Sequence, residues 1–368
     1  MKKTIGILTF HRAKNYGAVL QAYSLCKFMQ KYGACEIIDY KNNSIEEVYY
    51  SKKGLVPFIK KIAKKILRHK SEKAKSIRYA RFNAFLNNEI NISKKAYNKE
   101  NISLCNSKYN VLIVGSDQVW NTQLTNCDYS YFLDFALDQL KIAYSCSFGN
   151  VNILRENSKN ISTYLRKFNL ITARELEGVD FINNLDSLNA SFVCDPVFLS
   201  SKEDWIKLSN KSEMSFKEPY ILVYEVANGT DLIDKALKYA KENKLNVYAI
   251  NHCGKQYNYD GIIEISNLGP YDFLNILVKS NVVFTTSFHG MALSLILNKK
   301  FTYELSNDKN NKNSRLVTLA ELFSVEDREL QKDNLDKPFN WEQINNIIKK
   351  LTEDASKKLN SVLGVDND

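Results

Sequence analysis

A histidine at the end of a hydrophobic run is the residue in this sequence best suited to proton transfer. His289 follows the apolar stretch 282–284 and the hydroxyls of 285–287, and Gly290 stands where a helical pattern begins. Because imidazole exchanges a proton near neutral pH, a histidine in a strand-to-helix turn is a candidate general acid or base. The alternative is a structural histidine whose nitrogens only satisfy hydrogen bonds in the fold.

A second turn, near the start of the chain, gathers positive charge. His11, Arg12 and Lys14 follow the apolar run 4–10 and precede a helical pattern that begins near residue 16. Cationic side chains beside the N–H groups of a helix start favour a bound anion. The absence of G-x-G-x-x-G argues against a dinucleotide, and a merely solvated polar turn is the plain alternative.

Carboxylates also end two predicted strands. Asp117 follows the run 111–115, where Gly115 permits close backbone approach and the acid is placed to hold a hydroxyl or to cap a helix. Asp39 ends an earlier strand, where nucleotide-binding folds often place a ribose-binding acid. Without the glycine fingerprint, that second interpretation carries little weight.

Arginines at strand and helix ends are the natural ligands of a phosphate or carboxylate. Arg12 and Arg174 each end a predicted strand, and Arg315 opens a later helix. The guanidinium group grips such anions with paired hydrogen bonds. For Arg174 the alternative is an ion pair with Glu175 or Glu177.

The elements that must position these residues form two successive α/β sets. The first set of strand-like runs covers 4–10, 35–39, 110–115, 141–146, 169–173 and 191–195, and the second covers 220–226, 245–250, 261–265, 281–286 and 301–304. Helical patterns at 230–242, 271–280 and 289–298 alternate with the second set. Strands alternating with helices predict parallel sheets. We therefore expect two Rossmann-like domains facing a cleft, one over 1–198 with a helical insertion at about 50–100, and one over 199–368. A terminal helix at 341–363 should pack back across a domain face.

Length and composition fit this organisation. The chain has 368 residues, of which 44% are hydrophobic and 12% aromatic, as in a folded globular protein. No apolar run is long enough to cross a bilayer, and the N-terminus lacks a signal-peptide cleavage pattern. Seven cysteines without a C-x-x-C pair and four dispersed histidines predict reduced thiols and no metal site.

The net charge of +10 is concentrated in one segment. Residues 52–81 hold twelve Lys and Arg and one acid, Glu72. Part of this segment has an apolar face opposite a basic one, which suits an anionic membrane surface. A helix packed on the protein with a solvated basic face is the alternative. Nucleic acid is not expected as a partner, because no recognised binding motif accompanies the charge.

The chain resembles the polysaccharide pyruvyl transferase family nearly from end to end. The resemblance rests on segments in a fixed order, namely 9–22, 115–121, Arg174-Glu175 with Gly178, Asp195-Pro196, 287–290 and 313–316. It implies a fold like that of GT-B glycosyltransferases and transfer of pyruvate from phosphoenolpyruvate to a sugar, forming a cyclic ketal. We expect the sugar to belong to a surface polysaccharide or its lipid-linked precursor, and no cofactor is implied.

The resemblance also assigns roles to individual residues. It implies that His289 is catalytic and that Arg174 binds the donor. Many members carry an arginine where this chain has Ser287, so we expect Arg12 or Arg315 to supply that phosphate contact. Beside His289, Asp117 is the second residue that we expect to be catalytic, by orienting the acceptor. Further residues expected at the site are Ser287 and Gly290 on the donor side, and His11, Asn15, Tyr16, Trp120 and Asn121 on the acceptor side.

Two rival functions stay open on the sequence alone. One is a GT-B glycosyltransferase that uses a nucleotide sugar. The other is a non-catalytic protein that binds a membrane surface or nucleic acid through residues 52–81. The transferase hypothesis predicts a cytoplasmic protein, with a peripheral position at the inner membrane face as an option.

Overall fold

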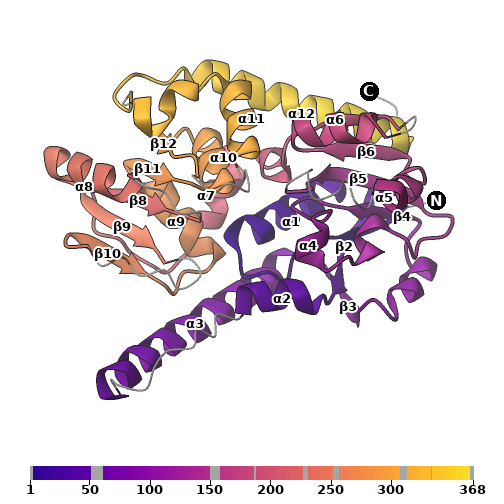
Figure 1. Cartoon of the computed structure of the whole chain (residues 1–368), viewed down its shortest axis with the longest axis horizontal. Helices are drawn as coiled ribbons and strands as arrows, with labels where there is room; N and C mark the ends of the chain where they lie inside the picture. Colours follow the sequence, from indigo (N-terminus) through magenta and orange to yellow (C-terminus); the bar gives the residue numbers. More distant parts are fainter. Residues whose placement is uncertain are drawn as a thin grey trace.

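A computed structural model describes most of the chain. It covers residues 3–50, 61–149, 158–185, 188–226, 231–251, 257, 259–306, 313–332 and 334–364. For residues 47–50, 61–71 and 158–159 it describes the backbone alone. Two parallel sheets, each flanked by helices, lie side by side in Figure 1.

Seven parallel strands form the first sheet, in the order β3-β2-β1-β4-β5-β6-β7. They are β1 (Lys3–Leu8), β2 (Gly33–Tyr40), β3 (Ile92–Tyr97), β4 (Val111–Val114), β5 (Leu140–Cys146), β6 (Leu170–Ala173) and β7 (Ala190–Phe192). The strand order reverses between β1 and β4. In sheets of this kind, ligands bind beyond the carboxyl ends of the strands near such a reversal.

Five parallel strands form the second sheet, in the order β10-β9-β8-β11-β12. They are β8 (Tyr220–Tyr224), β9 (Asn246–Ile250), β10 (Ile262–Ile265), β11 (Val282–Thr285) and β12 (Phe301–Tyr303). Here the order reverses between β8 and β11, so the turn after β11 also lies at a reversal point. The predicted fold class, two Rossmann-like sheets, is confirmed.

Helices connect the strands and cover the sheets (Figure 1). The α-helices are α1 (Tyr16–Met29), α2 (Asn43–Tyr50), α3 (Lys61–Glu89), α4 (Thr122–Thr125), α5 (Ser158–Leu165), α6 (Leu176–Asn183), α7 (Lys202–Ser209), α8 (Leu232–Asn243), α9 (Pro270–Lys279), α10 (Phe288–Ile296), α11 (Ser314–Phe323) and α12 (Trp341–Leu363). Short 3₁₀ turns are η1 (Ile102–Ser107), η2 (Tyr129–Phe132), η4 (Pro196–Leu199), η5 (Glu326–Arg328) and η6 (Leu330–Lys332).

One strand of the first sheet escapes the sequence prediction. Each of the eleven runs expected as strands contains or adjoins one, but β3 lies inside the expected helical insertion. Its sequence, ISKKAY, places Lys94 and Lys95 side by side on an exposed stretch. Among the strands that the structure describes, β3 pairs with β2 alone and so forms a sheet edge, where lysines are common because they discourage pairing with other chains. An edge strand of this composition lacks the apolar run that identified the others.

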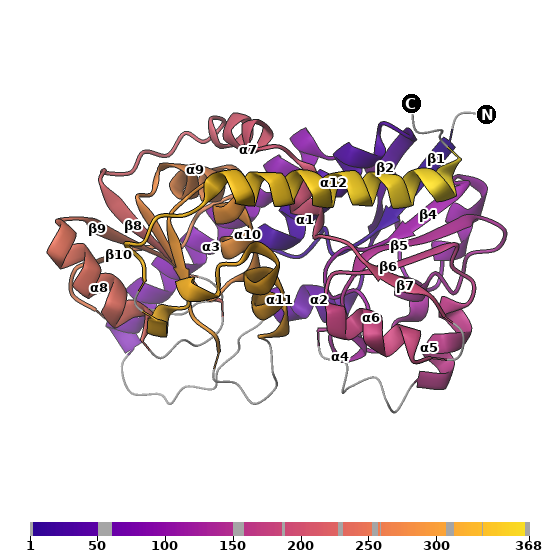
Figure 2. The same ribbon diagram turned by 90° about the horizontal axis from the view of Figure 1, so that it is seen from above.

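The terminal helix packs back across both domains, as predicted. Figure 2 shows α12 running over the second sheet and on to the first. Near its C-terminal end, the Tyr32 hydroxyl donates to Asn360 Oδ1 at 2.7 Å. Nearer its middle, the Thr352 hydroxyl donates to the carbonyl of Phe198 at 3.2 Å. The helix therefore ties the last part of the chain to the first domain.

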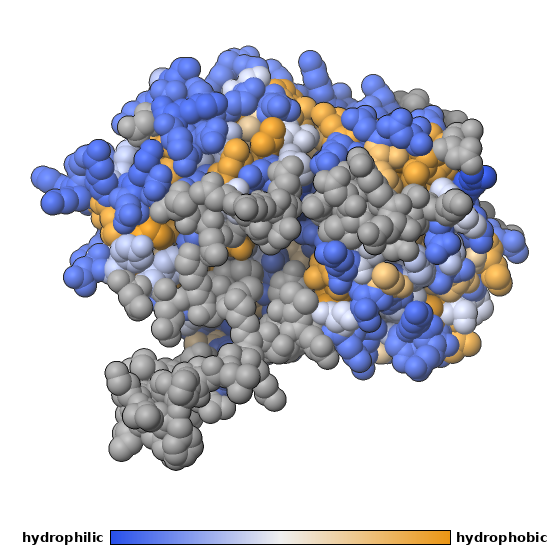
Figure 3. Space-filling model, in the orientation of Figure 1, coloured by the Kyte–Doolittle hydropathy of each residue, from blue (hydrophilic) through white to orange (hydrophobic). Residues whose placement is uncertain are grey.

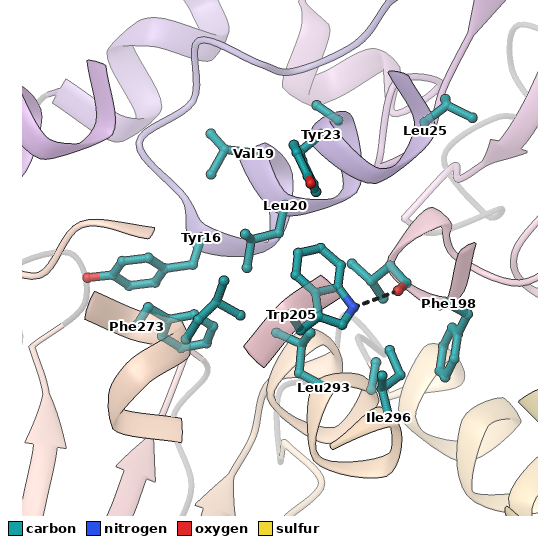
Figure 4. Packing of buried hydrophobic residues seen from close by; sticks show 14 of the residues in the cluster. Tyr16, Val19, Leu20, Tyr23, Leu25, Phe198, Trp205, Phe273, Leu293 and Ile296 are labelled. Atoms are coloured by element: carbon teal, nitrogen blue, oxygen red, sulfur yellow. Dashed lines mark hydrogen bonds between the residues drawn. The ribbon is translucent and has the colours of Figure 1, made fainter. Parts of the chain in front are cut away.

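A continuous hydrophobic core joins the two domains. Helix α1 of the first domain packs against elements of the second (Figure 4). Tyr16 stacks on Phe273 of α9, with ring centroids 4.5 Å apart and planes 8° from parallel. Trp205 is fully buried and donates from Nε1 to the carbonyl of Val197 at 3.2 Å. An apolar interface of this kind holds the sheets in a fixed relative orientation.

The insertion helix α3 bridges the domains and extends beyond them. Its last part buries Phe82 and Phe85 in the shared core, while Arg81 pairs with Asp272 of α9 at 3.0 Å. Its first part projects away beneath the second domain in Figure 1. Over the described residues, no helix is long and apolar enough to span a membrane. On the face shown in Figure 3, hydrophobic residues form separate patches between hydrophilic ones.

Candidate active site

A buried arginine surrounded by acids lies at the carboxyl edge of the first sheet. The side chain of Arg174 is 0% exposed, and its three nitrogens each face a different carboxylate. Nη1 donates to Asp195 at 2.8 Å, Nη2 to Asp117 at 3.1 Å, and Nε to Glu175 at 3.4 Å. Burial opposes the charge of Arg174, but these acids raise its pKa further above the usual value. Arg174 is therefore a fixed cation at the centre of the group.

The strand order explains why these residues meet. Asp117, Arg174 and Asp195 follow β4, β6 and β7, whose carboxyl ends lie along one edge of the sheet. Gly115, with φ of 118°, leaves no room for a side chain, because a Cβ would lie 2.1 Å from the carbonyl oxygen of Tyr144. This confirms the close backbone approach predicted there. Asp117 then adopts φ of 75°, a left-handed conformation that acids tolerate better than most residues. It pairs with Arg174, while the N-cap of α4 is Asn121.

His289 reaches the same group from the second domain. It lies in the first turn of α10, directly after β11, and its side chain is 10% exposed. Its Nε2 atom lies 3.7 Å from Asp195 Oδ2, within ion-pair range but beyond a hydrogen bond. Nε2 is buried and has no hydrogen-bond partner among the described residues. A buried polar atom in this state is costly, which makes it a candidate for contact with a substrate.

Asp195 connects the histidine to the arginine. Burial alone would raise the pKa of its carboxyl group, but His289 and Arg174 together hold that pKa well below the usual range. The backbone N–H of Val197 adds a hydrogen bond at 3.0 Å. Asp195 is thus a permanent negative charge beside the imidazole of His289.

Arg315 is the less neutralised of the two arginines in this group. Its side chain is 16% exposed, and its Nε lies 4.0 Å from Glu175 Oε1, too far for a hydrogen bond. Burial lowers the pKa of Arg315, and the positive charge of Arg174 lowers it further. A cation that is partly desolvated and loosely paired is suited to an incoming anion.

A narrow pocket lies between these residues. Arg174, Asp195, Phe288 and Arg315 are among the residues that line it. The Arg174 guanidinium lies 5.3 Å from the centre of the Phe288 ring. The internal volume is about 10 Å³, which is about the space of one water molecule. This pocket is therefore too small for a ligand larger than water in this structure.

The sequence was compared with models of known protein families, and one of them matches most of the chain. A sequence model described as polysaccharide pyruvyl transferase matches residues 15–303. The chain belongs to the polysaccharide pyruvyl transferase family. It is accordingly a transferase enzyme. A search of curated protein sequences gives no significant match.

Solved structures similar to this pyruvyl transferase show the fold alone. One UDP-N-acetylglucosamine 2-epimerase is 12% identical, with a TM-score of 0.51 over 100% of this chain and 98% of its own. The corresponding epimerase from Rickettsia bellii is 10% identical, with a TM-score of 0.50 over 99% and 97%. S. aureus MnaA, solved with UDP, is 12% identical, with a TM-score of 0.50 over 100% and 98%. These identities are too low to carry an activity across.

The pyruvyl transferase keeps Arg12 in a separate group. Arg12 Nε and Nη2 donate to the two carboxylate oxygens of Asp39, each at 2.8 Å. His11 Nε2 contacts the same carboxylate at 3.0 Å, and its Nδ1 faces the carbonyl of Thr9 at 3.2 Å. Arg12 follows β1 and its partner Asp39 lies on β2, and these strands are three and four strand spacings from β6, or about 14 and 19 Å across the sheet. The structure does not bring Arg12 to the other predicted donor ligands, so we assign it to this separate ion pair.

Three of the five residues predicted for the acceptor have packing roles. His11 is 1% exposed and has both ring nitrogens engaged, and Tyr16 stacks between the domains. Trp120 is 0% exposed, stacks on Phe132 at 5.5 Å, and donates to the carbonyl of Tyr131 at 3.0 Å. Their burial and existing contacts give each of them a role in the fold, and contact of any of them with a sugar stays a prediction.

The other two predicted acceptor residues cap helices. The Asn15 side chain accepts from the N–H of Ala18 at the start of α1. The Asn121 side chain accepts from Leu124 at the start of α4. Both are only partly buried, so their role toward an acceptor stays a prediction.

Ser287 and Gly290 shape the turn that carries His289. Ser287 Oγ accepts from the N–H of Gly290 at 3.3 Å and so caps α10. A Cβ at Gly290 would lie 2.4 Å from Thr285 Oγ1, so only glycine lets the helix start this close to β11. Their contacts indicate that they position the histidine, and direct donor contact by either stays a prediction.

Sequence reasoning assigned no site role to Asp195 or Glu175. Both are buried against Arg174, and Glu175 Oε1 also accepts from the Ser147 hydroxyl at 2.6 Å. The available signal was their place directly after strand-like runs, together with the family segments that contain them.

Several other predictions concern the basic segment and the cysteines. Residues 51–60 and the side chains of 61–71 lie outside the described residues, so membrane binding by 52–81 stays a prediction. Two of its cations, Arg78 and Arg81, are engaged within the protein, since Arg78 donates to the carbonyl of Lys14 at 2.8 Å. Six cysteines are described and none forms a disulfide, while Cys253 lies outside the described residues. The same part of the chain contains no group of acidic, histidine or cysteine residues that could hold a metal ion.

Proposed function

We propose that this enzyme transfers pyruvate from phosphoenolpyruvate to two hydroxyl groups of a polysaccharide sugar, forming a cyclic ketal. The observation that carries the proposal is the state of His289. Its Nε2 is buried, lacks a hydrogen-bond partner among the described residues, and lies 3.7 Å from the ionised Asp195. A proton-transfer group needs a free nitrogen and a neighbour that stabilises its charged form, and this residue has both.

The donor is expected to bind against Arg315. Phosphoenolpyruvate carries a phosphate and a carboxylate, and Arg315 has no hydrogen-bonded partner among the described residues. Arg174 contributes positive charge from within its acid group and holds Asp117 and Asp195 in place. Because the pocket interior is only about 10 Å³, a donor that entered this pocket would have to displace side chains that line it, such as Phe288 and Arg315.

The reaction balances without a cofactor. The first sugar hydroxyl loses its proton as its oxygen bonds to the central carbon of the enol, and the methylene carbon gains a proton. The bond from the central carbon to the phosphate oxygen then breaks and releases inorganic phosphate. The second hydroxyl bonds to the same carbon and loses its proton, which closes the ketal ring. His289 transfers protons in this sequence, and Asp195 stabilises its charged form.

The structure also bears on the glycosyltransferase alternative. In nucleotide-binding α/β domains, a phosphate commonly sits at the helix N-terminus after the first strand. In the second sheet of this enzyme that helix is α8, and its first N–H groups already donate to a carboxylate. Glu304 accepts from Asp231 N at 3.0 Å and from Leu232 N at 3.2 Å. This arrangement disfavours a nucleotide phosphate at that position.

One assay separates the functions. The enzyme is incubated with phosphoenolpyruvate and candidate glycans, both free and lipid-linked, and phosphate release is measured alongside the mass of the acceptor. We expect acceptor-dependent phosphate release and a mass gain equal to pyruvate less water. Thermal stabilisation by a nucleoside diphosphate, with no turnover of phosphoenolpyruvate on any acceptor, would instead support the glycosyltransferase.

A further inference from the structure

Gly17 and His289 meet across the seam between the domains. Gly17 is the second residue of α1 in the first domain, and His289 is the second residue of α10 in the second. A Cβ built on Gly17 would lie 2.0 Å from His289 Nδ1 and 2.4 Å from both Cγ and Cε1. Real Cβ atoms essentially never approach other atoms this closely. The imidazole therefore occupies the space that any side chain at position 17 would need.

The backbone of Gly17 gives no other reason for a glycine. Among the described glycines, those with positive φ are Gly115, Gly149, Gly261 and Gly364, and Gly17 is not one of them. In a helix, glycine is less favourable than alanine by up to about 1 kcal/mol. The fold thus keeps a residue that weakens the start of α1. The contact with His289 supplies the physical reason.

The residue before Gly17 prevents α1 from moving away. Tyr16 stacks on Phe273, and its hydroxyl donates to the carbonyl of Leu268 at 3.2 Å. The guanidinium of Arg78 lies 5.1 Å from the centre of the Tyr16 ring on α1. All of these groups are buried or partly buried. The first turn of α1 is therefore held firmly against the second domain, at the place where the histidine stands.

We propose that Gly17 is a positioning residue for His289. The bare backbone of α1 forms one wall of the space for the imidazole, and Asp195 lies opposite on the Nε2 side, 3.7 Å away. A ring confined between these two cannot turn its free nitrogen away from the seam. This inference rests on the proposed function of His289 in proton transfer, and it explains why a tyrosine and a glycine open α1.

The test compares two glycine-to-alanine substitutions. Gly17→Ala should displace the imidazole and lower kcat by about 10²-fold, the size expected for a misplacement of about 1 Å, with the KM for phosphoenolpyruvate changed less than threefold. Gly178→Ala is the matched control. Gly178 is also helical and also near the arginine group, but a Cβ there would meet its nearest atom, in Phe148, at 3.5 Å. Its kcat should stay at the wild-type value.

A double substitution shows whether Gly17 acts through His289. In the wild-type background, the clash with the imidazole should also make Gly17→Ala lower the melting temperature. In a His289→Ala background the clash is absent, so adding Gly17→Ala should lower neither kcat nor the melting temperature any further. An equal fold-loss in both backgrounds, or a wild-type kcat for Gly17→Ala, would overturn the inference. A wild-type kcat for His289→Ala would instead overturn the proposed function, so the two failures are distinguishable.

A third pair covers the case in which Gly17→Ala alone does not fold. His289→Gly opens a space, and added imidazole should restore part of its activity. Gly17→Ala/His289→Gly has no clash, but its new methyl group takes the place of the added imidazole. Rescue should therefore be lost in the double variant, and equal rescue in both would contradict the proposal.

Discussion

Two groups along the carboxyl edge of the first sheet contain the same residue types in very different states. The first joins His11, Arg12 and Asp39, and the second joins Arg174, Asp195 and the incoming His289. In the first group both ring nitrogens of the histidine and the fork of the arginine meet acceptors within 3.2 Å. In the second, the histidine keeps an unpartnered Nε2.

This difference teaches how to tell a structural group from a site. Both groups bring an imidazole, a guanidinium and a carboxylate to the ends of parallel strands, so their residue types do not separate them. The two groups are separated by whether their polar atoms have hydrogen-bond partners. A group whose polar atoms are all partnered stabilises the fold and gains little from a ligand. On this criterion we propose the His289 group as the site, while the His11 group holds the loop after β1 in place.

The sharpest way to break this comparison is to replace each histidine with glutamine. His289→Gln should lower kcat by about 10²–10⁴-fold, the usual loss of a general acid or base, with little change in melting temperature. His11→Gln should leave kcat within a few fold and destabilise the protein by about 1–3 kcal/mol, because buried partners lose their hydrogen bonds. Steady-state kinetics and thermal unfolding measure both effects. A large loss of kcat for His11→Gln, with a near wild-type kcat for His289→Gln, would show that the His11 group is the site instead.

The arginines offer a second, smaller contrast. Arg315→Gln should raise the KM for phosphoenolpyruvate by about 10- to 100-fold, because a charge-assisted contact contributes about 1.5–3 kcal/mol. Arg12→Gln is the matched control and should leave that KM unchanged, since Arg12 is committed to Asp39. Donor titrations at saturating acceptor measure both values. If only Arg12→Gln raised the KM, the donor would bind at the turn after β1 that carries Arg12, and the assignment to Arg315 would be wrong.

The smallest effect concerns acid stability. Burial alone would raise the pKa of Asp39, but His11 and Arg12 lower it to about 2. A carboxyl group whose pKa falls on folding stabilises the folded state at pH values above its unfolded pKa of about 3.9. That contribution is lost as the pH falls through about 2. Asp39→Asn should therefore remove about 1–2 kcal/mol at pH 5 and flatten the decline between pH 4 and pH 2. Denaturant unfolding across that range measures it, and an unchanged slope would contradict the assigned ion pair.

Much of the fold could be predicted from the sequence, and the site only in part. Buried parallel strands are long apolar runs, so eleven of them were recognisable, whereas β3 with its paired lysines was not. His289, Arg174 and Arg315 were recognisable because each ends a strand or opens a helix. The contact of Asp117 and Asp195 with Arg174 was not recognisable, because it depends on which strands are neighbours. For the same reason the sequence could not separate Arg12, which pairs with Asp39, from the Arg174 group.

The most direct test of the account follows the imidazole signals of the four histidines by NMR while phosphoenolpyruvate is added. Assignment comes from single histidine substitutions. The account predicts that the resonances of His289 shift in proportion to donor occupancy, while those of His11 stay in place. Movement of His11 with no change at His289 would contradict it.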